Sequence, residues 1–215
     1  MQTAAPFVPA SASSIAELRD AAPACRGCEL WEPATQVVFG RGDEHAKVIF
    51  VGEQPGDVED QKGLPFVGPA GHLLRRAVDD AGLPVSDLYI TNSVKHFRFE
   101  RRGARRIHKT PDQQHITACH PWLVSEFAQL RPSLVVLLGA TAAKAVLGPS
   151  FRVTRQRGQL MPWPASAQHP ADFPSGHEAK ALATIHPSAV LRADDREAAY
   201  NGLVADLRVA ATALT

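Results

Sequence analysis

Short, uninterrupted apolar segments alternate with segments of helical periodicity along most of this chain. Four apolar segments stand out, and each is too short for a typical helix: AKVIFVGE (46–53), DLYITN (87–92), SLVVLLG (133–139) and ALATIHP (181–187). Runs without alternating polar residues are typical of strands buried on both faces of a parallel sheet. Helical patterns occupy 69–82, 111–130, 140–148 and 195–212. This alternation predicts a three-layer α/β/α sandwich around a central, mostly parallel sheet.

Polar residues and glycines gather where the predicted strands end. GEQPG (52–56) follows the first strand, Asn92 ends the second, Gly139 ends the third, and His186 follows the fourth. The carboxyl ends of parallel strands share one edge of a sheet, and ligands bind at that edge. We therefore expect these residues to surround one site.

The chain length of 215 residues suits one folded unit. We expect a single domain at 13–215, preceded by a loose Ala-, Pro- and Ser-rich tail at 1–12. GQLMPW (158–163) is compatible with an edge or crossing strand, and 166–181 with a surface loop. No apolar run approaches the ~20 residues that cross a bilayer, and the N-terminus lacks a signal-peptide pattern. The expectation is a cytoplasmic monomer with no membrane contact.

Positive charge is concentrated on one segment of an almost neutral chain. Residues 95–109 contain seven Lys or Arg and one acid, Glu100, a local charge of +6. The whole chain carries +1, so the remainder carries about −5 (1 − 6). A basic segment on a neutral protein favours a polyanionic partner, with nucleic acid first. The plainer alternative is a solvated basic loop with no partner.

The chain has three cysteines, Cys25, Cys28 and Cys119. An odd number argues against a disulfide framework. The Cys-x-x-Cys spacing and a third thiol favour a metal site whose fourth ligand is not cysteine, with histidine the expected substitute. Spacing alone does not separate zinc from an iron–sulfur cluster, and unrelated buried thiols are the alternative.

The segment 52–71 is rich in glycine and proline and directly follows a strand. It matches neither the GxxxxGK[ST] phosphate loop nor GxGxxG, which argues against nucleotide hydrolysis and dinucleotide binding. Phe66 inside it is either a core residue or a stacking surface for a planar ligand. Asn92 either caps a turn or offers a donor and an acceptor to a base edge. His186 is either structural or catalytic.

Several motifs, in this order, resemble the uracil-DNA glycosylase superfamily, in particular its iron–sulfur-containing family 4 branch. They are VGEQPGDVEDQKGLPFVGPAG (51–71), YITNSVKH (89–96), CHPWL (119–123) and IHPSAVLR (185–192). The resemblance extends from Cys25 to about Leu207. GEQPG combined with an extended basic loop ending in RRIHKTP (105–111) most resembles the UdgX group, which bonds covalently to uracil-containing DNA.

The resemblance implies a four-stranded parallel sheet, a [4Fe–4S] cluster and uracil-containing DNA as the partner. In the family 4 pattern a cysteine follows N-x-x-K after the second strand, and His96 stands there in this chain. The implied cluster ligands are Cys25, Cys28, His96 and Cys119.

The resemblance also implies roles for other residues. His108 would attack the anomeric carbon of the flipped deoxyuridine, Glu53 would orient it or take its proton, and His186 would hydrogen-bond the departing uracil. Phe66 would stack on the base while Asn92 reads its edge. The implied uracil-binding residues are Gln54, Gly56, Asp57, Phe66 and Asn92. The implied DNA-backbone contacts are Arg101, Arg102, Arg105, Arg106 and Lys109.

Three functions remain open besides a single-turnover glycosylase that stays bonded to DNA. The nearest is an ordinary family 4-like glycosylase that releases uracil and turns over. The second is a non-catalytic damage-binding module with structural zinc. The third is an electron-transfer protein, for which the sequence holds no cofactor loop.

Overall fold

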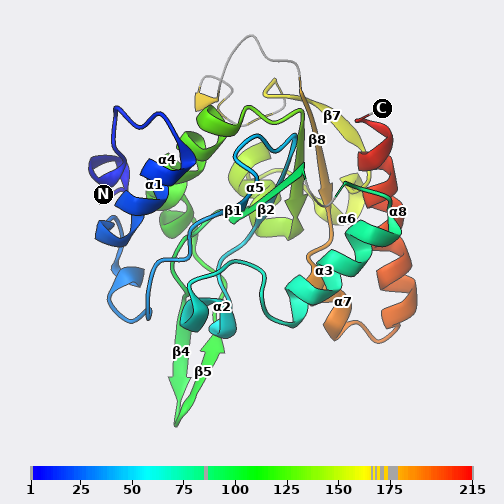
Figure 1. Ribbon diagram of the computed structural model, residues 1–215. Coiled ribbons are helices and arrows are strands. Elements are labelled where there is room, and N and C mark those ends of the chain that lie inside the picture. Colours follow the sequence, from blue (N-terminus) through cyan, green and yellow to red (C-terminus); the bar gives the residue numbers. More distant parts are fainter. Residues whose placement is uncertain are drawn as a thin grey trace.

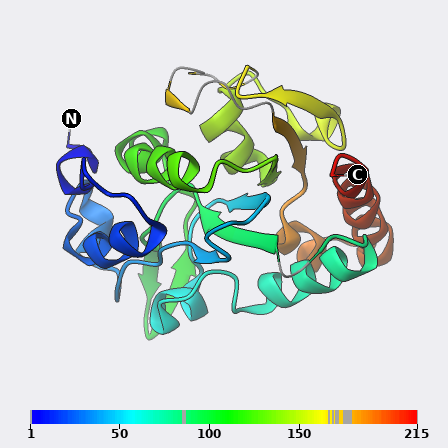
Figure 2. The same ribbon diagram turned by 45° about the horizontal axis from the view of Figure 1, so that its top comes forward.

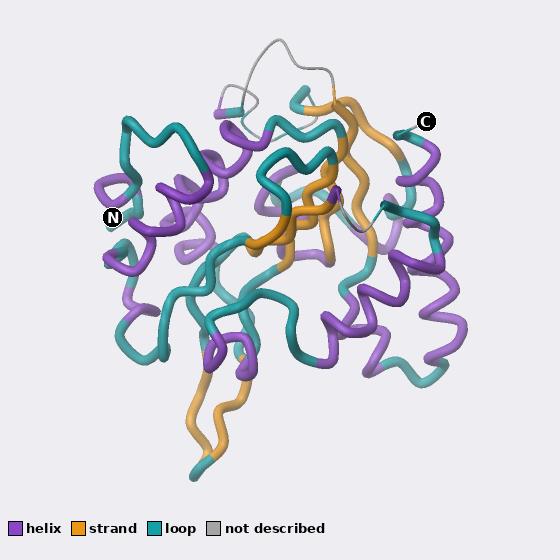
Figure 3. Tube along the Cα trace, viewed as in Figure 1, coloured by secondary structure: helices purple, strands orange, loops and turns teal. Residues whose placement is uncertain are grey.

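The computed structural model describes residues 2–84, 87–165, 167, 169, 172–173 and 179–214. A six-stranded sheet with the order β1-β3-β2-β6-β8-β7 forms its centre (Figures 1 and 3). Its strands are β1 Arg41–Gly42, β2 Val48–Gly52, β3 Leu88–Asn92, β6 Leu134–Leu138, β7 Leu160–Trp163 and β8 Ala179–Thr184. The predicted fold class is confirmed. The four predicted strands form the parallel centre, and the short strands β1 and β7 add an antiparallel edge on each side.

Alternating residues of the central strands enter two separate apolar clusters. On β2, Ile49 and Val51 face one cluster, while Val48 and Phe50 face the other. The first cluster contains side chains of α1, α4 and α5, and the second those of α3, α7 and α8. Helices therefore cover both faces of the sheet (Figure 2). The helices of the described residues are α1 Ile15–Ala21, α2 Asp57–Lys62, α3 Pro69–Asp80, α4 Gln113–Leu130, α5 Gly139–Leu147, α6 Val153–Gln156, α7 Pro187–Arg192 and α8 Arg196–Thr212, with 3-10 turns at Ala5–Phe7, Ala22–Ala24 and Glu29–Trp31.

The basic segment is not the loop that its composition predicted. It folds into an antiparallel hairpin of β4 Phe99–Arg102 and β5 Arg105–His108, which projects from the body of the molecule (Figure 1). Gly103 at its tip has φ 59°, a value that glycine adopts without strain. His108 is the last residue of β5, opposite Phe99. A hairpin holds this histidine more rigidly than a loop would.

The N-terminal segment, expected to be loose, has defined contacts. Ala4 is buried, and its amide donates to the carbonyl of Ala118 on α4 at 2.7 Å. The predicted surface loop at 166–181 lies mostly outside the described residues. Within the described residues, no helix combines the length and the apolar character needed to cross a bilayer.

Candidate active site

A cavity of about 900 Å³ opens at the carboxyl ends of the parallel strands. Its lining includes seven of the residues predicted from the sequence to form the site: Glu53, Gln54, Gly56, Phe66, Asn92, His108 and His186. They come from the ends of β2, β3, β5 and β8 and from the loop before α3. The topology therefore brings the predicted strand-end residues together.

Asn92 presents an unpaired acceptor to this cavity. Its side chain is 1% exposed, and Oδ1 has no hydrogen-bond partner within the described structure. A buried polar atom without a partner is costly, and such atoms are few in folded proteins. The site is therefore built to receive a donor at this point.

The ring of Phe66 lines the same cavity, although its backbone has the uncommon positive φ of 53°. Two glycines leave room for it. A Cβ at Gly71 would lie 1.8 Å from the Phe66 carbonyl oxygen, and one at Gly52 would lie 2.6 Å from the Phe66 ring. The Phe66 and His186 ring centroids are 6.0 Å apart. A strained residue held in place by its surroundings is typical of a ligand site.

His186 is held in one tautomer. Its Nδ1 accepts a hydrogen bond from the backbone amide of Ser188 at 3.1 Å, and the Ser188 hydroxyl lies 2.8 Å from the same nitrogen. Nδ1 therefore carries no proton, and Nε2 is the N–H donor. Burial lowers the pKa of His186 to about 4, with Arg192 and His108 adding to the shift. At neutral pH this side chain is an uncharged donor.

His108 reaches the cavity from the hairpin. Its Nε2 lies 3.3 Å from Glu53 Oε1 and 2.9 Å from Gln54 Nε2. Glu53 Oε2 accepts a short hydrogen bond from Thr141 at the start of α5, which fixes the carboxylate. Burial lowers the pKa of His108, with Arg192 acting in the same direction and Glu53 opposing it. A neutral imidazole with a free nitrogen can act as a nucleophile.

Gln54 holds the base of the hairpin. Its amide nitrogen donates to the carbonyls of Arg98 at 3.2 Å and Lys109 at 2.9 Å, and its Oε1 accepts from the Arg98 amide at 3.0 Å. These bonds join both hairpin strands to the loop after β2. Gln54 therefore positions His108, in addition to lining the cavity.

Two predicted site residues form an ion pair with each other, and their predicted roles stay predictions. Asp57 was expected to bind uracil, but it is not among the cavity-lining residues and pairs with Arg106 at 2.5 Å. Arg106 was expected to contact the DNA backbone, but its side chain is 12% exposed and also pairs with buried Asp60 at 2.6 Å. These ion pairs attach β5 to α2, so Arg106 fastens the hairpin to the domain.

The other basic residues of the hairpin differ in availability. Lys109 and Arg102 pair with Glu100, at 2.8 and 3.5 Å. Arg101 and Arg105 are exposed near the tip and form no ion pair with a described residue. These two are the most available contacts for a polyanion.

The three cysteines lie near one another and are shielded, wholly or partly, from solvent. Their thiols lie within electrostatic range of one another, and burial raises the pKa of Cys119 to about 12 and also raises that of Cys28. The Lys95 amide donates to Cys119 Sγ, and Trp122 Nε1 donates to Cys25 Sγ, each at 3.3 Å. Buried N–H groups directed at sulfur are a feature of Fe–S sites.

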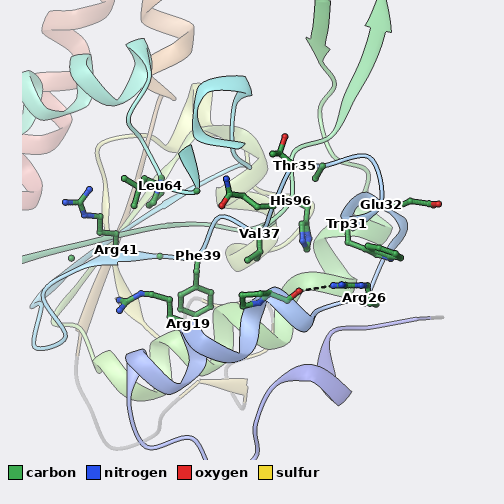
Figure 4. A pocket seen from close by; sticks show the side chains of 17 residues that line it. Arg19, Arg26, Trp31, Glu32, Thr35, Val37, Phe39, Arg41, Leu64 and His96 are labelled. Carbon is green, nitrogen blue, oxygen red and sulfur yellow. Dashed lines mark hydrogen bonds between the residues drawn. The ribbon is translucent and has the colours of Figure 1, made fainter. Parts of the chain in front are cut away.

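His96 is less closely connected to the cysteines. It is buried and lines a second cavity with Arg26 and Trp31 (Figure 4), and burial lowers its pKa to about 4. Within the described residues, no three His, Cys, Asp or Glu side chains converge as a site for a single metal ion. The four predicted cluster ligands, Cys25, Cys28, Cys119 and His96, therefore stay a prediction.

Several residues at the site carried no local signal in the sequence. Thr141, Lys144 and Arg192 line the cavity from α5 and α7. Lys95 and Glu126 form a buried ion pair of 2.5 Å, and Lys95 also donates to the backbone carbonyl of Asn92. Thr141 follows Gly139, which was identified at a strand end. Glu126 lies in the middle of a helix, and only the fold brings it to the site.

Comparison with known proteins points to one family. The model of the family described as "Uracil DNA glycosylase superfamily" matches residues 39–208. The type-4 uracil-DNA glycosylase of Sulfurisphaera tokodaii is 33% identical over 186 residues, covering 84% of this chain and 81% of that protein. That of Thermotoga maritima is 36% identical over 169 residues, 78% of each chain. That of Archaeoglobus fulgidus is 34% identical over 174 residues, also 78% of each.

Proposed function

Because this chain belongs to the uracil-DNA glycosylase superfamily, we propose that it excises uracil from DNA and then remains bonded to the deoxyribose through His108. The relatives named as type-4 uracil-DNA glycosylases support the excision. The observation that supports the covalent step is the position of His108, which enters the strand-end cavity beside Glu53.

The cavity suits a uracil that has been flipped out of the DNA stack. The unpaired Oδ1 of Asn92 would accept the N3–H of uracil, and its Nδ2 would donate to O4. Cytosine has an acceptor at N3 and a donor at N4. The acceptor Oδ1 of Asn92 would then face an acceptor, and the donor Nδ2 would face a donor, so cytosine would bind poorly. Phe66 would stack on the ring, and the backbone of Gln54 to Gly56 would close the pocket.

His186 would stabilise the leaving group. When the C1′–N1 bond breaks, its electron pair moves onto uracil, and the developing anion needs a hydrogen-bond donor. The Nε2–H of neutral His186 provides one, because Nδ1 accepts from the Ser188 amide. Because His186 is uncharged, it would stabilise the developing anion through a hydrogen bond and not through an ion pair.

His108 would complete the reaction as a nucleophile. In the tautomer with its proton on Nδ1, Nε2, which lies 2.9 Å from the Gln54 amide nitrogen, carries a lone pair that would have to leave that donor to react. That pair forms the Nε2–C1′ bond as the C1′–N1 bond breaks, and the imidazolium then loses its Nδ1 proton to solvent. In the other tautomer, with its proton on Nε2, His108 would donate to Glu53 Oε1 at 3.3 Å, which orients the ring; during attack the same carboxylate would stabilise the positive charge that develops on the sugar and the imidazole. Imidazole bonded to carbon through nitrogen is a poor leaving group, so the new bond would resist hydrolysis and the protein would act once.

A [4Fe–4S] cluster held by Cys25, Cys28, Cys119 and His96 would cross-link the N-terminal loops to α4 and to the loop after β3. The cluster would supply structural stability when bound. The N–H donors from Lys95 and Trp122 would remain on two of its sulfur ligands.

The second candidate is a turnover glycosylase that releases free uracil. The three relatives named type-4 uracil-DNA glycosylases favour it. In that case a water molecule would take the place of the His108 nitrogen at C1′.

One experiment separates the candidates. The protein is incubated with matched oligonucleotides containing uracil or thymine, and the products are resolved by denaturing electrophoresis. The proposal predicts a denaturation-resistant protein–DNA band with uracil only. Alkali-labile sites without such a band would indicate turnover. If neither the band nor alkali-labile sites form, the proposed glycosylase activity is refuted.

A further inference from the structure

The protein has a second cavity of about 870 Å³, whose lining includes Arg19, Arg26, Trp31 and Arg41 (Figure 4). It shares no lining residue with the first cavity. One short loop separates them, because Gly63, Leu64 and Pro65 line the second cavity while Phe66 lines the first. The segment 63–66 therefore connects the two cavities.

The second cavity is positively charged. Arg19, Arg26 and Arg41 line it, and Glu32 is its one acidic residue, a balance of +2 (3 − 1). None of these arginines forms an ion pair with another described residue. Arg26 donates instead to two backbone carbonyls, which leaves its charge uncompensated. A concave surface of one sign of charge attracts counter-ions of the other.

The second cavity also exposes apolar side chains suited to nucleobases. Trp31 is 38% exposed and Leu64 is 39% exposed, and together they are two of the three exposed large hydrophobic residues in the described structure. The Arg26 guanidinium lies 4.3 Å from the centroid of the Trp31 ring. Aromatic surfaces beside arginines are the common design of sites for single-stranded nucleic acid, where bases stack and cations hold phosphates.

We propose that this second cavity binds unpaired nucleotides of the DNA strand that carries the uracil. The inference rests on the proposed function, since it assigns the strand on the basis of the neighbouring uracil site. The chain has no GxxxxGK[ST] loop for a free nucleoside triphosphate, and the shared loop at 63–66 connects the two cavities. Arg19 and Arg41 hold phosphates, and Trp31 stacks on a base.

The first test is the salt dependence of binding. Single-stranded 15-mers carrying a cleavage-resistant 2′-fluoro-deoxyuridine are titrated with wild type, with the double variant Arg19→Gln/Arg41→Gln, and with a charge-matched control, Lys47→Gln/Lys180→Gln. Both control lysines are exposed near the amino ends of parallel strands, away from the cavities. The slope of log K against log salt should fall by about 1.4 for the arginine variant, about 0.7 for each phosphate. The control should keep the wild-type slope.

The second test uses Trp31. It is the exposed tryptophan, since Trp122 and Trp163 are 0% and 5% exposed. The 15-mer should quench its fluorescence, and Trp31→Ala should weaken 15-mer binding at least about 5-fold. Binding of a uracil-containing trinucleotide, which has only two further bases to offer Trp31, should weaken less than binding of the 15-mer.

The outcomes distinguish this inference from the proposed function. Suppose the wild type reacts with uracil DNA, but Arg19→Gln/Arg41→Gln and Trp31→Ala both bind the 15-mer as the Lys47→Gln/Lys180→Gln control does. The second cavity then does not bind the strand. Equal losses on the 15-mer and the trinucleotide would also refute it, because the variants would then act on the uracil site. If the wild type shows no preference for uracil DNA, the proposed function itself fails.

Discussion

The Nε2 atom of His108 lies 3.3 Å from Oε1 of Glu53, although the two residues are 55 positions apart in the chain. Glu53 follows the central strand β2, whereas His108 ends a hairpin that is not part of the main sheet. The proposed nucleophile and its orienting carboxylate therefore approach from independent elements. The contact depends on how firmly the hairpin is attached.

Replacing His108 should separate adduct formation from base release. In His108→Ser the denaturation-resistant adduct should be lost, and space for water should allow release of free uracil. His45→Ser is the matched control, because His45 is exposed and is not part of either cavity. Denaturing electrophoresis measures the adduct, and chromatography measures free uracil. A persistent adduct in His108→Ser would mean that another residue is the nucleophile.

The attachment of the hairpin gives a second prediction. Arg106→Gln should leave Asp60, which is 0% exposed, without its ion-pair partner. Breaking such a pair should lower the free energy of unfolding by about 3 kcal/mol. It should also slow adduct formation at least about tenfold, since a nucleophile displaced by about 1 Å loses roughly 100-fold.

Arg102→Gln is the control for this prediction. Arg102 is 68% exposed and pairs with Glu100 at 3.5 Å. It should change stability by no more than about 1 kcal/mol, the range of surface ion pairs. Urea denaturation and single-turnover kinetics measure both effects. Equal behaviour of the two variants would show that the Arg106 ion pairs do not position His108.

The sequence predicted the parts of the fold whose signal is local. Continuous apolar runs predicted the four central strands, and the rule for strand ends then predicted six of the residues that line the cavity: Glu53, Gln54, Gly56, Asn92, Gly139 and His186. The hairpin was not predicted, because an arginine-rich segment has the composition of a loop. Its attachment depends on Gln54, Asp57 and Asp60, which lie 44 to 55 residues away in the sequence. Local spacing could not show that Arg106 pairs with acids while Arg105 remains exposed.

The lowered pKa of His108 predicts how the rate of adduct formation depends on pH. Attack requires neutral imidazole, and burial holds the pKa of His108 below its ordinary value of 6.5. The neutral fraction increases with pH, so the adduct rate should rise with pH and level off once His108 is neutral. The half-maximal rate should occur below pH 6.5.

Glu53→Gln tests the origin of this midpoint. Glu53 opposes the downward shift of the His108 pKa, so its neutralisation should move the midpoint to lower pH while the maximal rate decreases. Single-turnover adduct rates between pH 4.5 and 8, at constant ionic strength, measure both quantities. A rate that does not rise with pH would contradict neutral His108 as the nucleophile, and an upward shift of the midpoint in the variant would contradict the effect of Glu53 on the His108 pKa.

The ion pair beneath Asn92 provides the last prediction. Lys95 and Glu126 are 1% and 0% exposed, and Lys95 Nζ also donates to the Asn92 carbonyl at 2.8 Å. Glu126 in turn accepts from the Tyr89 hydroxyl at 2.9 Å. Burial raises the pKa of Tyr89, and the negative charge of Glu126 raises it further. One buried pair therefore supports the backbone of the residue proposed to read uracil.

Removing one partner of this pair should be strongly destabilising. Glu126→Gln and Lys95→Met should each lower the free energy of unfolding by about 3–5 kcal/mol, because each leaves the other charge buried and unpaired. The double variant should lose less than the sum of the single variants, because neither charge remains. Arg76→Gln is the control: its pair with Asp80 is 3.8 Å long and exposed, so the change should be about 0.5 kcal/mol. Additive single-variant losses in a double-mutant cycle would show that Lys95 and Glu126 act independently, and that the ion pair does not support Asn92.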